Sequence, residues 1–165
     1  MKQGRTKQFV MTCGNIGTGK TTSVNRVLMD MPVGSFLLWN TDVIAQALNN
    51  GAYTPEVHTT EYMSVYLNLK YSAVNLACQL GLDIVLDDCH MHTSERAVPC
   101  QLAKMHGYEC NLLVHLHASG VDRRMTSDPR GYPAELWEEI HTSFAAKWVE
   151  PSKEEGWDNI YFMGK

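Results

Sequence analysis

Short apolar runs alternate with longer stretches of helical period along the chain. The runs that predict β-strands are Phe9–Cys13, Phe36–Trp39, Ile84–Leu86, Leu112–Leu116 and Ile160–Met163. Three of them, the first, the third and the fourth, are apolar at nearly every position, as strands covered on both faces are. Strands that alternate with helices are typical of a parallel sheet with a helical layer on each side. The pattern therefore predicts an α/β fold.

Three longer segments have the spacing of amphipathic helices. In 63–78 the apolar residues form a single stripe, which comprises Met63, Leu67, Tyr71, Val74 and Cys78. Gly81 follows this segment as a helix stop signal. A second helix is expected from Ser94 to Met105. The third begins near Pro133 with acidic residues in its first turn, and its stripe comprises Leu136, Ile140, Phe144 and Trp148.

Length and composition favour one soluble, cytoplasmic domain over 1–165. No apolar run approaches the roughly 18 residues that a membrane-spanning helix needs, so we expect no membrane partner. The net charge of −4 argues against a broad basic face for duplex nucleic acid. The five cysteines are odd in number and lack a CxxC spacing, which favours mostly buried, reduced thiols over a disulfide framework or a structural zinc site.

One motif follows the first predicted strand directly. Residues 14–21 fit GxxxxGK[ST] without a mismatch: Gly14, Asn15, Ile16, Gly17, Thr18, Gly19, Lys20 and Thr21. Glycines let successive N–H groups turn toward an anion, and the helix expected over Lys20–Met29 adds unpaired donors at its N-terminus. The motif predicts a site for the phosphates of ATP or GTP, with Lys20 on the β- and γ-phosphates and the Thr21 hydroxyl on Mg²⁺.

Acidic residues end two of the other predicted strands. Asp42 follows the second strand, where a carboxylate could accept a proton from an attacking hydroxyl. The alternative is that Asp42 only caps a helix over Val43–Leu48. Asp87 and Asp88 follow the third strand, in an arrangement that can hold Mg²⁺ or its waters. Counting along the strand leaves open which of the two faces the metal.

A loop rich in Gly and Pro lies between two predicted helices and contains or adjoins Arg123, Arg124 and Arg130. Guanidinium groups suit phosphate oxygens, so we interpret 123–133 as a candidate lid with at least one catalytic arginine. Two His-x-His pairs, at 90–92 and 115–117, could in principle bind a metal, but neither has a third ligand at a telling spacing. Structural roles for these histidines are favoured.

Together these segments resemble the P-loop kinase domain of phage-type polynucleotide 5′-kinases and related small P-loop kinases. The matching segments are 14–22, which adds Thr22 to the nucleotide site, and 40–42, 83–88, 123–133 and 155–162. The resemblance implies a three-layer sandwich with a five-stranded parallel sheet flanked by helices. It also implies that Asp42 is the general base, that Asp88 serves the metal, and that Arg130, with Arg123 or Arg124, engages the donor phosphates.

The sequence departs from the family pattern on the acceptor side. Polynucleotide kinases have an arginine three residues beyond the base, where this chain has Ala45, and an asparagine two residues beyond the third-strand acid, where it has His90. We expect γ-phosphate transfer to the 5′-OH of a single-stranded nucleic acid. The alternatives are a kinase of a small molecule, nucleoside or modified base, and a P-loop ATPase or regulatory module. The oligomeric state is left open.

Overall fold

The computed structural model describes residues 5–29, 31–51, 59–116 and 132–163. Within these ranges the strands are β1 (Gln8–Gly14), β2 (Phe36–Trp39), β3 (Asp83–Leu86), β4 (Glu109–His115) and β5 (Asn159–Met163). They form one sheet in the order β2-β3-β1-β4-β5, and every neighbouring pair is parallel. The predicted five-stranded parallel sheet is confirmed.

Strand β4 begins at Glu109, earlier than the predicted start at Leu112. Two of the three missed positions, Glu109 and Asn111, are polar, and their side chains bond across the sheet. The Asn111 amide donates to Gln8 Oε1 of β1 at 2.8 Å, and the Asn159 amide of β5 donates to Asn111 Oδ1 at 2.9 Å. Because partners from neighbouring strands satisfy these amides, a search for apolar runs alone does not detect this part of the strand.

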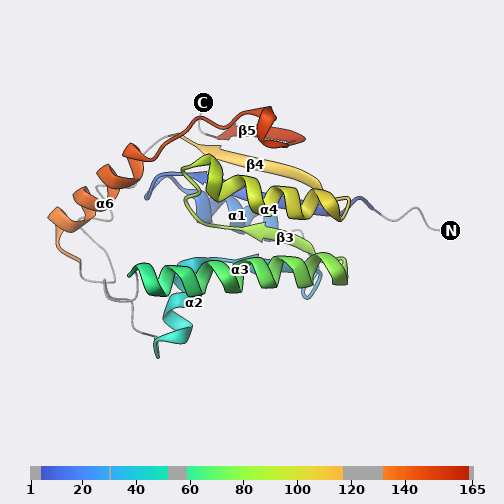
Figure 1. The fold of residues 1–165 in the computed structure, drawn as a ribbon, viewed down its shortest axis with the longest axis horizontal. Helices are drawn as coiled ribbons and strands as arrows, with labels where there is room; N and C mark the ends of the chain where they lie inside the picture. The colour runs from blue at the N-terminus through green and yellow to red at the C-terminus, as the bar shows by residue number, and fades with distance from the viewer. Residues whose placement is uncertain (1–4, 30, 52–58, 117–131, 164–165) are drawn as a thin grey trace.

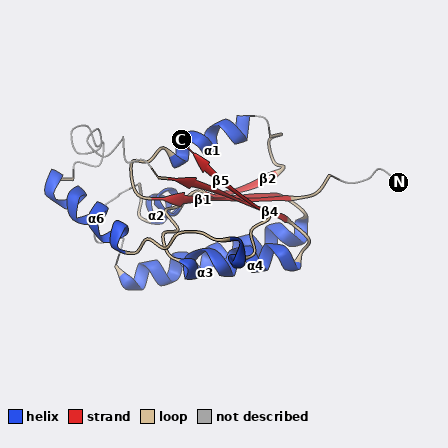
Figure 2. Ribbon diagram, turned by 90° about the horizontal axis from the view of Figure 1, so that it is seen from above, coloured by secondary structure: helices blue, strands red, loops and turns tan. Residues whose placement is uncertain are grey.

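Helices pack on both faces of the sheet, as Figure 2 shows. Helix α1 (Lys20–Met29) covers one face, and α3 (Thr60–Leu80) and α4 (Thr93–Met105) cover the other. The short α2 (Thr41–Leu48) contacts α3. Helix α6 (Ala134–Ala146) lies beyond the edge of the sheet at which the strands end, on the left of Figure 1. The arrangement is the expected three-layer sandwich.

The buried face of α3 differs from the predicted stripe in its first half. Its buried residues are Tyr66, Lys70, Val74, Ala77 and Cys78, whereas the predicted Leu67 is 38% exposed. The pattern misled because the core-facing position between Tyr66 and Val74 is occupied by a lysine. The predicted stop is confirmed, since Gly81 ends the helix in the left-handed conformation with φ of 64°.

Side chains of β1 alternate between the two halves of the core. Phe9, Met11 and Cys13 belong to the large cluster under α3 and α4, whereas Val10 packs with Val24 of α1. Packing on both faces therefore holds β1 at the centre of the sheet, directly before the phosphate loop. Among the helices in the described ranges, none is both long enough and apolar enough to cross a bilayer.

Candidate active site

The phosphate-binding motif forms the turn between β1 and α1. Gly14 has φ of 144°, and a Cβ atom placed there would lie 2.4 Å from the carbonyl oxygen of His115 in β4. Gly17 and Gly19 have φ of 72° and 89°, values that side chains rarely adopt. The glycines are therefore required by close packing at Gly14 and by backbone conformation at the other two positions.

Asn15 connects other residues of the phosphate loop to one another and to α6 by hydrogen bonds. Its carbonyl oxygen accepts hydrogen bonds from Lys20 Nζ at 2.6 Å and from the Thr18 hydroxyl at 2.8 Å. Its side-chain amide donates to the carbonyl of His141 in α6 at 2.9 Å. The loop is thus braced against α6, the helix that follows the candidate lid. The Lys20 ammonium lies at the loop, and its contact with the phosphates stays a prediction.

Asp87 is the acid that the structure brings to the phosphate loop. It follows β3 and is 4% exposed, and its Oδ2 accepts a hydrogen bond from the Thr21 hydroxyl at 2.7 Å. The Asn40 amide donates to the carbonyl oxygen of Asp87 at 2.9 Å and approaches Oδ2 at 3.2 Å. A hydroxyl and a carboxylate side by side at the start of α1 provide the hard oxygen ligands that Mg²⁺ prefers.

Asp88 points to a different set of partners. Its Oδ1 accepts from the backbone N–H of Thr41 at 2.9 Å, and its Oδ2 accepts from the Thr41 hydroxyl at 2.8 Å and from Lys70 Nζ at 3.3 Å. Burial opposes ionisation of Asp88, but the Lys70 ammonium and the Thr41 hydrogen bonds outweigh it and keep the pKa of this carboxyl below its usual value. Asp88 is therefore bound to the start of α2, not to Thr21. Its metal role stays a prediction.

Asp42 is the second residue of α2 and is half-buried. The cap of this helix is Asn40, whose side-chain oxygen accepts from the Val43 N–H at 3.1 Å. The alternative that Asp42 serves as the cap is therefore wrong. Because α2 begins at the end of β2, Asp42 lies at the same edge of the sheet as the phosphate loop. Its role as general base stays a prediction.

Ala45, which stands where polynucleotide kinases have an arginine, occupies a position in the packed interior. Ala45 is fully buried and contacts Tyr66 of α3 within a small apolar cluster that also includes Ile44 and Met63. A side chain at this position is directed into the protein. The α2 helix therefore offers no cationic group at 45 to an acceptor.

The histidines of the two His-x-His pairs have unlike surroundings. His90 Nδ1 lies 2.8 Å from the carbonyl oxygen of Thr12, whereas His92 accepts from the Ser94 N–H at the start of α4. His115 Nδ1 lies 3.2 Å from the Thr18 carbonyl oxygen of the phosphate loop, and the second histidine of its pair, His117, is outside the described residues. In the described part of the chain, no three His, Cys, Asp or Glu side chains are grouped so that they could hold a metal.

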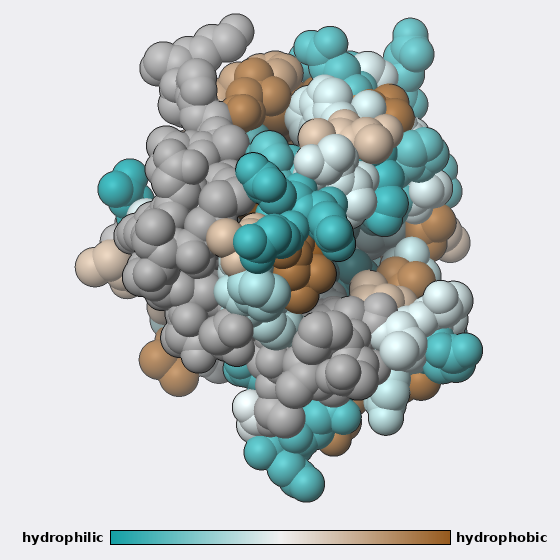
Figure 3. All heavy atoms as spheres, turned by 90° about the vertical axis from the view of Figure 1, so that its left-hand side faces the viewer, coloured by the Kyte–Doolittle hydropathy of each residue, from teal (hydrophilic) through white to brown (hydrophobic). Residues whose placement is uncertain are grey.

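The proposed lid and its arginines, Arg123, Arg124 and Arg130, lie outside the described residues. Of the described site residues, sequence reasoning missed Lys70, the buried cation beside Asp88. A lysine four residues from Tyr66 and four from Val74 on the core face of a helix was the signal that could have found it. Figure 3 shows the molecule from the side on which α6 lies, with hydrophilic side chains gathered near the centre of the view beside a hydrophobic one.

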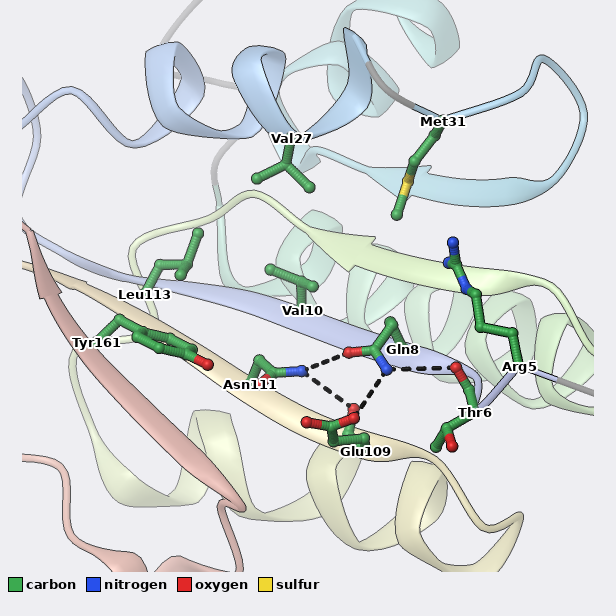
Figure 4. Close-up of a pocket in the computed structure, with 10 residues that line it drawn as sticks. All are labelled: Arg5, Thr6, Gln8, Val10, Val27, Met31, Glu109, Asn111, Leu113 and Tyr161. Atoms are coloured by element: carbon green, nitrogen blue, oxygen red, sulfur yellow. Dashed lines mark hydrogen bonds between the residues drawn. The ribbon is translucent and has the colours of Figure 1, made fainter.

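The cavity that Figure 4 shows is separate from the phosphate site. It is a cavity of about 650 Å³ on the α1 face, and Gln8, Asn111, Val27 and Tyr161 are among the residues that line it. Its polar residues lie near the amino ends of β1 and β4. Gln8 is six residues before Gly14, or roughly 20 Å along an extended strand. This cavity plays no part in the phosphate site.

A family model described as an AAA domain, AAA_33, matches residues 9–147. No curated protein sequence shows significant similarity to the chain. The match includes the phosphate loop, both acidic strand ends and the segment that contains Arg123, Arg124 and Arg130.

Solved structures share the fold. A chain of the Pnkp1/Rnl/Hen1 RNA repair complex superimposes with a TM-score of 0.65 and 11% identity over 88% of this chain and 46% of that one. The APS kinase CysC of Mycobacterium tuberculosis, solved with AMPPNP and APS, gives 0.60 and 15% over 98% and 91%. A sugar kinase from a Janibacter species gives 0.58 and 16% over 94% and 85%. The chain spans less than half, from 42% to 48%, of three solved chains, one of which is the repair-complex chain described above. At these identities the likeness shows the fold alone.

Proposed function

Because the chain belongs to the AAA_33 family of P-loop domains, we propose that it is a phosphotransferase that moves the γ-phosphate of ATP to a hydroxyl group. The observation that best supports this proposal is that a candidate metal site and a candidate general base lie at the same edge of the sheet. The Thr21 hydroxyl bonds Asp87 at 2.7 Å at the phosphate loop, and Asp42 lies in the first turn of α2, which Asn40 ties to Asp87.

On the donor side, the loop amides and Lys20 would bind the phosphates and offset the charge that develops on them during transfer. Thr21 and Asp87 are the residues that fit Mg²⁺, since one hydroxyl and one carboxylate leave room for phosphate oxygens and waters. The ion, when bound, would neutralise part of the charge of the phosphates. Arg130, with Arg123 or Arg124, is proposed to engage the same phosphates from the lid.

On the acceptor side, Asp42 would accept the proton of the acceptor hydroxyl while its oxygen attacks the γ-phosphorus. The bond between the γ-phosphorus and the β–γ bridging oxygen breaks in the same displacement, and ADP leaves with that oxygen. Atoms and charge balance without a further reactant.

The leading acceptor is the 5′-OH of a single-stranded nucleic acid. The order and spacing of the motifs support it, and so does the fold shared with a chain of the Pnkp1/Rnl/Hen1 RNA repair complex. A small hydroxyl compound, such as a sugar or nucleoside, is the second candidate. Buried Ala45 favours the second candidate, because it removes the cation expected to grip a phosphate beside a 5′ end.

The deciding experiment is transfer of radiolabel from the γ-position of ATP to 5′-OH DNA, 5′-OH RNA, nucleosides and amino sugars. We expect label on the 5′-OH oligonucleotides and none on matched oligonucleotides that already bear a 5′-phosphate. Label on a small acceptor alone would replace the leading candidate with the second. Release of inorganic phosphate with every acceptor unlabelled would identify an ATPase and contradict the proposal.

Asp87, not Asp88, is proposed to serve Mg²⁺, because only Asp87 bonds Thr21. We expect Asp87→Asn to raise the Mg²⁺ concentration for half-maximal transfer by at least about 10-fold, because losing even an outer-shell partner of a metal ligand typically costs about 10–100-fold in metal affinity. Asp88→Asn, the matched control one residue away, should leave this Mg²⁺ requirement unchanged. A Mg²⁺ titration that showed the reverse order would restore the metal role to Asp88.

A further inference from the structure

Lys70 is a cation buried in the middle of α3. The residue is 6% exposed, and its Nζ lies 3.3 Å from Asp88 Oδ2 and 3.4 Å from His90 Nε2. A buried ammonium is costly unless it is paired and hydrogen-bonded, so a lysine on the core face of a helix needs these partners. Sheet packing does not require a charge at this place.

His90 is arranged to accept from Lys70. Its Nδ1 lies 2.8 Å from the Thr12 carbonyl oxygen, which can only accept, so Nδ1 bears the proton and Nε2 is the acceptor for the lysine. Burial and the Lys70 ammonium lower the pKa of His90 to about 4, which keeps it neutral. His90 also has φ of 42°, in the left-handed region. Strain of this kind in a non-glycine residue is concentrated at functional sites.

Asp88 connects Lys70 to the first turn of α2. Both of its oxygens accept from Thr41, from the backbone N–H at 2.9 Å and from the hydroxyl at 2.8 Å. Thr41 is the first residue of α2, and Asp42 is the second. A continuous set of contacts therefore runs from Thr12, near the end of β1, through His90, Lys70 and Asp88, to the turn that contains Asp42.

We propose that Lys70 is a positioning residue for the acceptor side of the site. It pairs with Asp88, and Asp88 in turn holds the first turn of α2, so that Asp42 is kept in place for the acceptor hydroxyl. This inference rests on the proposed function, in which Asp42 is the base. It assigns Lys70 no contact with the substrate.

Lys70→Met tests the proposal, since methionine keeps the length of the side chain and removes the charge. We expect kcat for transfer to a 5′-OH oligonucleotide, or to the acceptor that the screen identifies, to fall by up to about 10²-fold, the cost of misplacing a reacting group. KM for ATP should change by less than about threefold, because the network does not reach the phosphates. Lys104→Met is the matched control. It removes the ion pair between Lys104, in the last turn of α4, and Asp158 at the surface. In this variant kcat should not change.

A double mutant separates positioning from direct contact. With Asp88→Asn already present, the carboxylate that needs a cation is gone, so adding Lys70→Met should cost less than about threefold more in kcat. The double variant also holds no uncompensated buried charge and should fold if the single variant does not. An equal loss of kcat in both backgrounds would mean that Lys70 acts on the substrate itself and would overturn the proposal.

Hydrogen exchange supplies a readout that needs no acceptor. Lys70→Met should speed amide exchange at Thr41 and the next residues of α2 and leave that of α1 unchanged. Unchanged exchange at α2, or a lower melting temperature with normal kcat, would overturn the proposal and leave Lys70 a structural residue. If Asp42→Asn retained full activity, the proposed base would fail, and the exchange result would still decide whether Lys70 fixes α2.

Discussion

Lys20→Ala is expected to abolish phosphate transfer and to leave the fold intact. The Lys20 ammonium lies over the phosphate loop, 2.6 Å from the Asn15 carbonyl oxygen, where it would meet the β- and γ-phosphates. Cationic groups that stabilise transferring phosphate are worth about 10³-fold or more in kcat. We therefore expect a loss of at least about 10³-fold, together with weaker ATP binding.

Arg26→Ala provides a matched control for that measurement. Arg26 is an exposed cation on the same helix, α1, but it lies in the last turn, away from the loop. Its removal should leave transfer and ATP binding unchanged, and circular dichroism and thermal melting should show both variants folded. A Lys20→Ala protein that retained most of its activity, or one that failed to fold, would contradict the assignment of this loop.

Those parts of the fold and site that depend on local sequence could be predicted. The run of β2 was located residue for residue, because all four of its residues, Phe36–Trp39, are apolar, although the strand lies at an edge of the sheet and is only partly buried. The phosphate loop was found for a similar reason. Gly14, Gly17 and Gly19 occupy backbone conformations or contacts that other residues do not tolerate, so their spacing is itself the signal.

Which of the two acids after β3 contacts Thr21 and which contacts Thr41 could not be predicted from the sequence. Asp87 and Asp88 are adjacent, and their partners are distant in the chain: Thr21 is 66 residues from Asp87, and Thr41 is 47 from Asp88. Alternation along a strand ends with the strand, so no count of positions tells which carboxylate turns toward which partner. Only the packing of β1, β2 and β3 side by side determines this.

Lys70 was missed for the opposite reason. Helical periodicity identifies a core face by its apolar residues, and a lysine there is taken as a sign that the face lies elsewhere. The shift of the predicted stripe to Leu67, which is 38% exposed, follows from that assumption. The burial of the Lys70 charge is explained by its partner Asp88, which is 18 residues away in the chain and lies outside α3.

Asp42→Asn is expected to lower kcat by about 10²–10⁴-fold, the usual contribution of a positioned general base. Asparagine has the same shape as aspartate but cannot accept the proton of the acceptor hydroxyl. ATP binding should be almost unchanged, because Asp42 belongs to α2 and the phosphates bind at the loop that opens α1. Steady-state transfer rates and titration with a non-hydrolysable ATP analogue would measure the two effects separately.

The structure sharpens the interpretation of this variant. Asn40 already caps α2 through the Val43 N–H, so Asp42→Asn should leave the melting temperature unchanged. Glu61→Gln, at an exposed acid in the first turn of α3, is the matched control and should leave kcat unchanged as well. If Asp42→Asn kept its activity, Asp42 would not be the base. The acceptor proton would then have to leave by another route, either to solvent or to a phosphate oxygen of the donor.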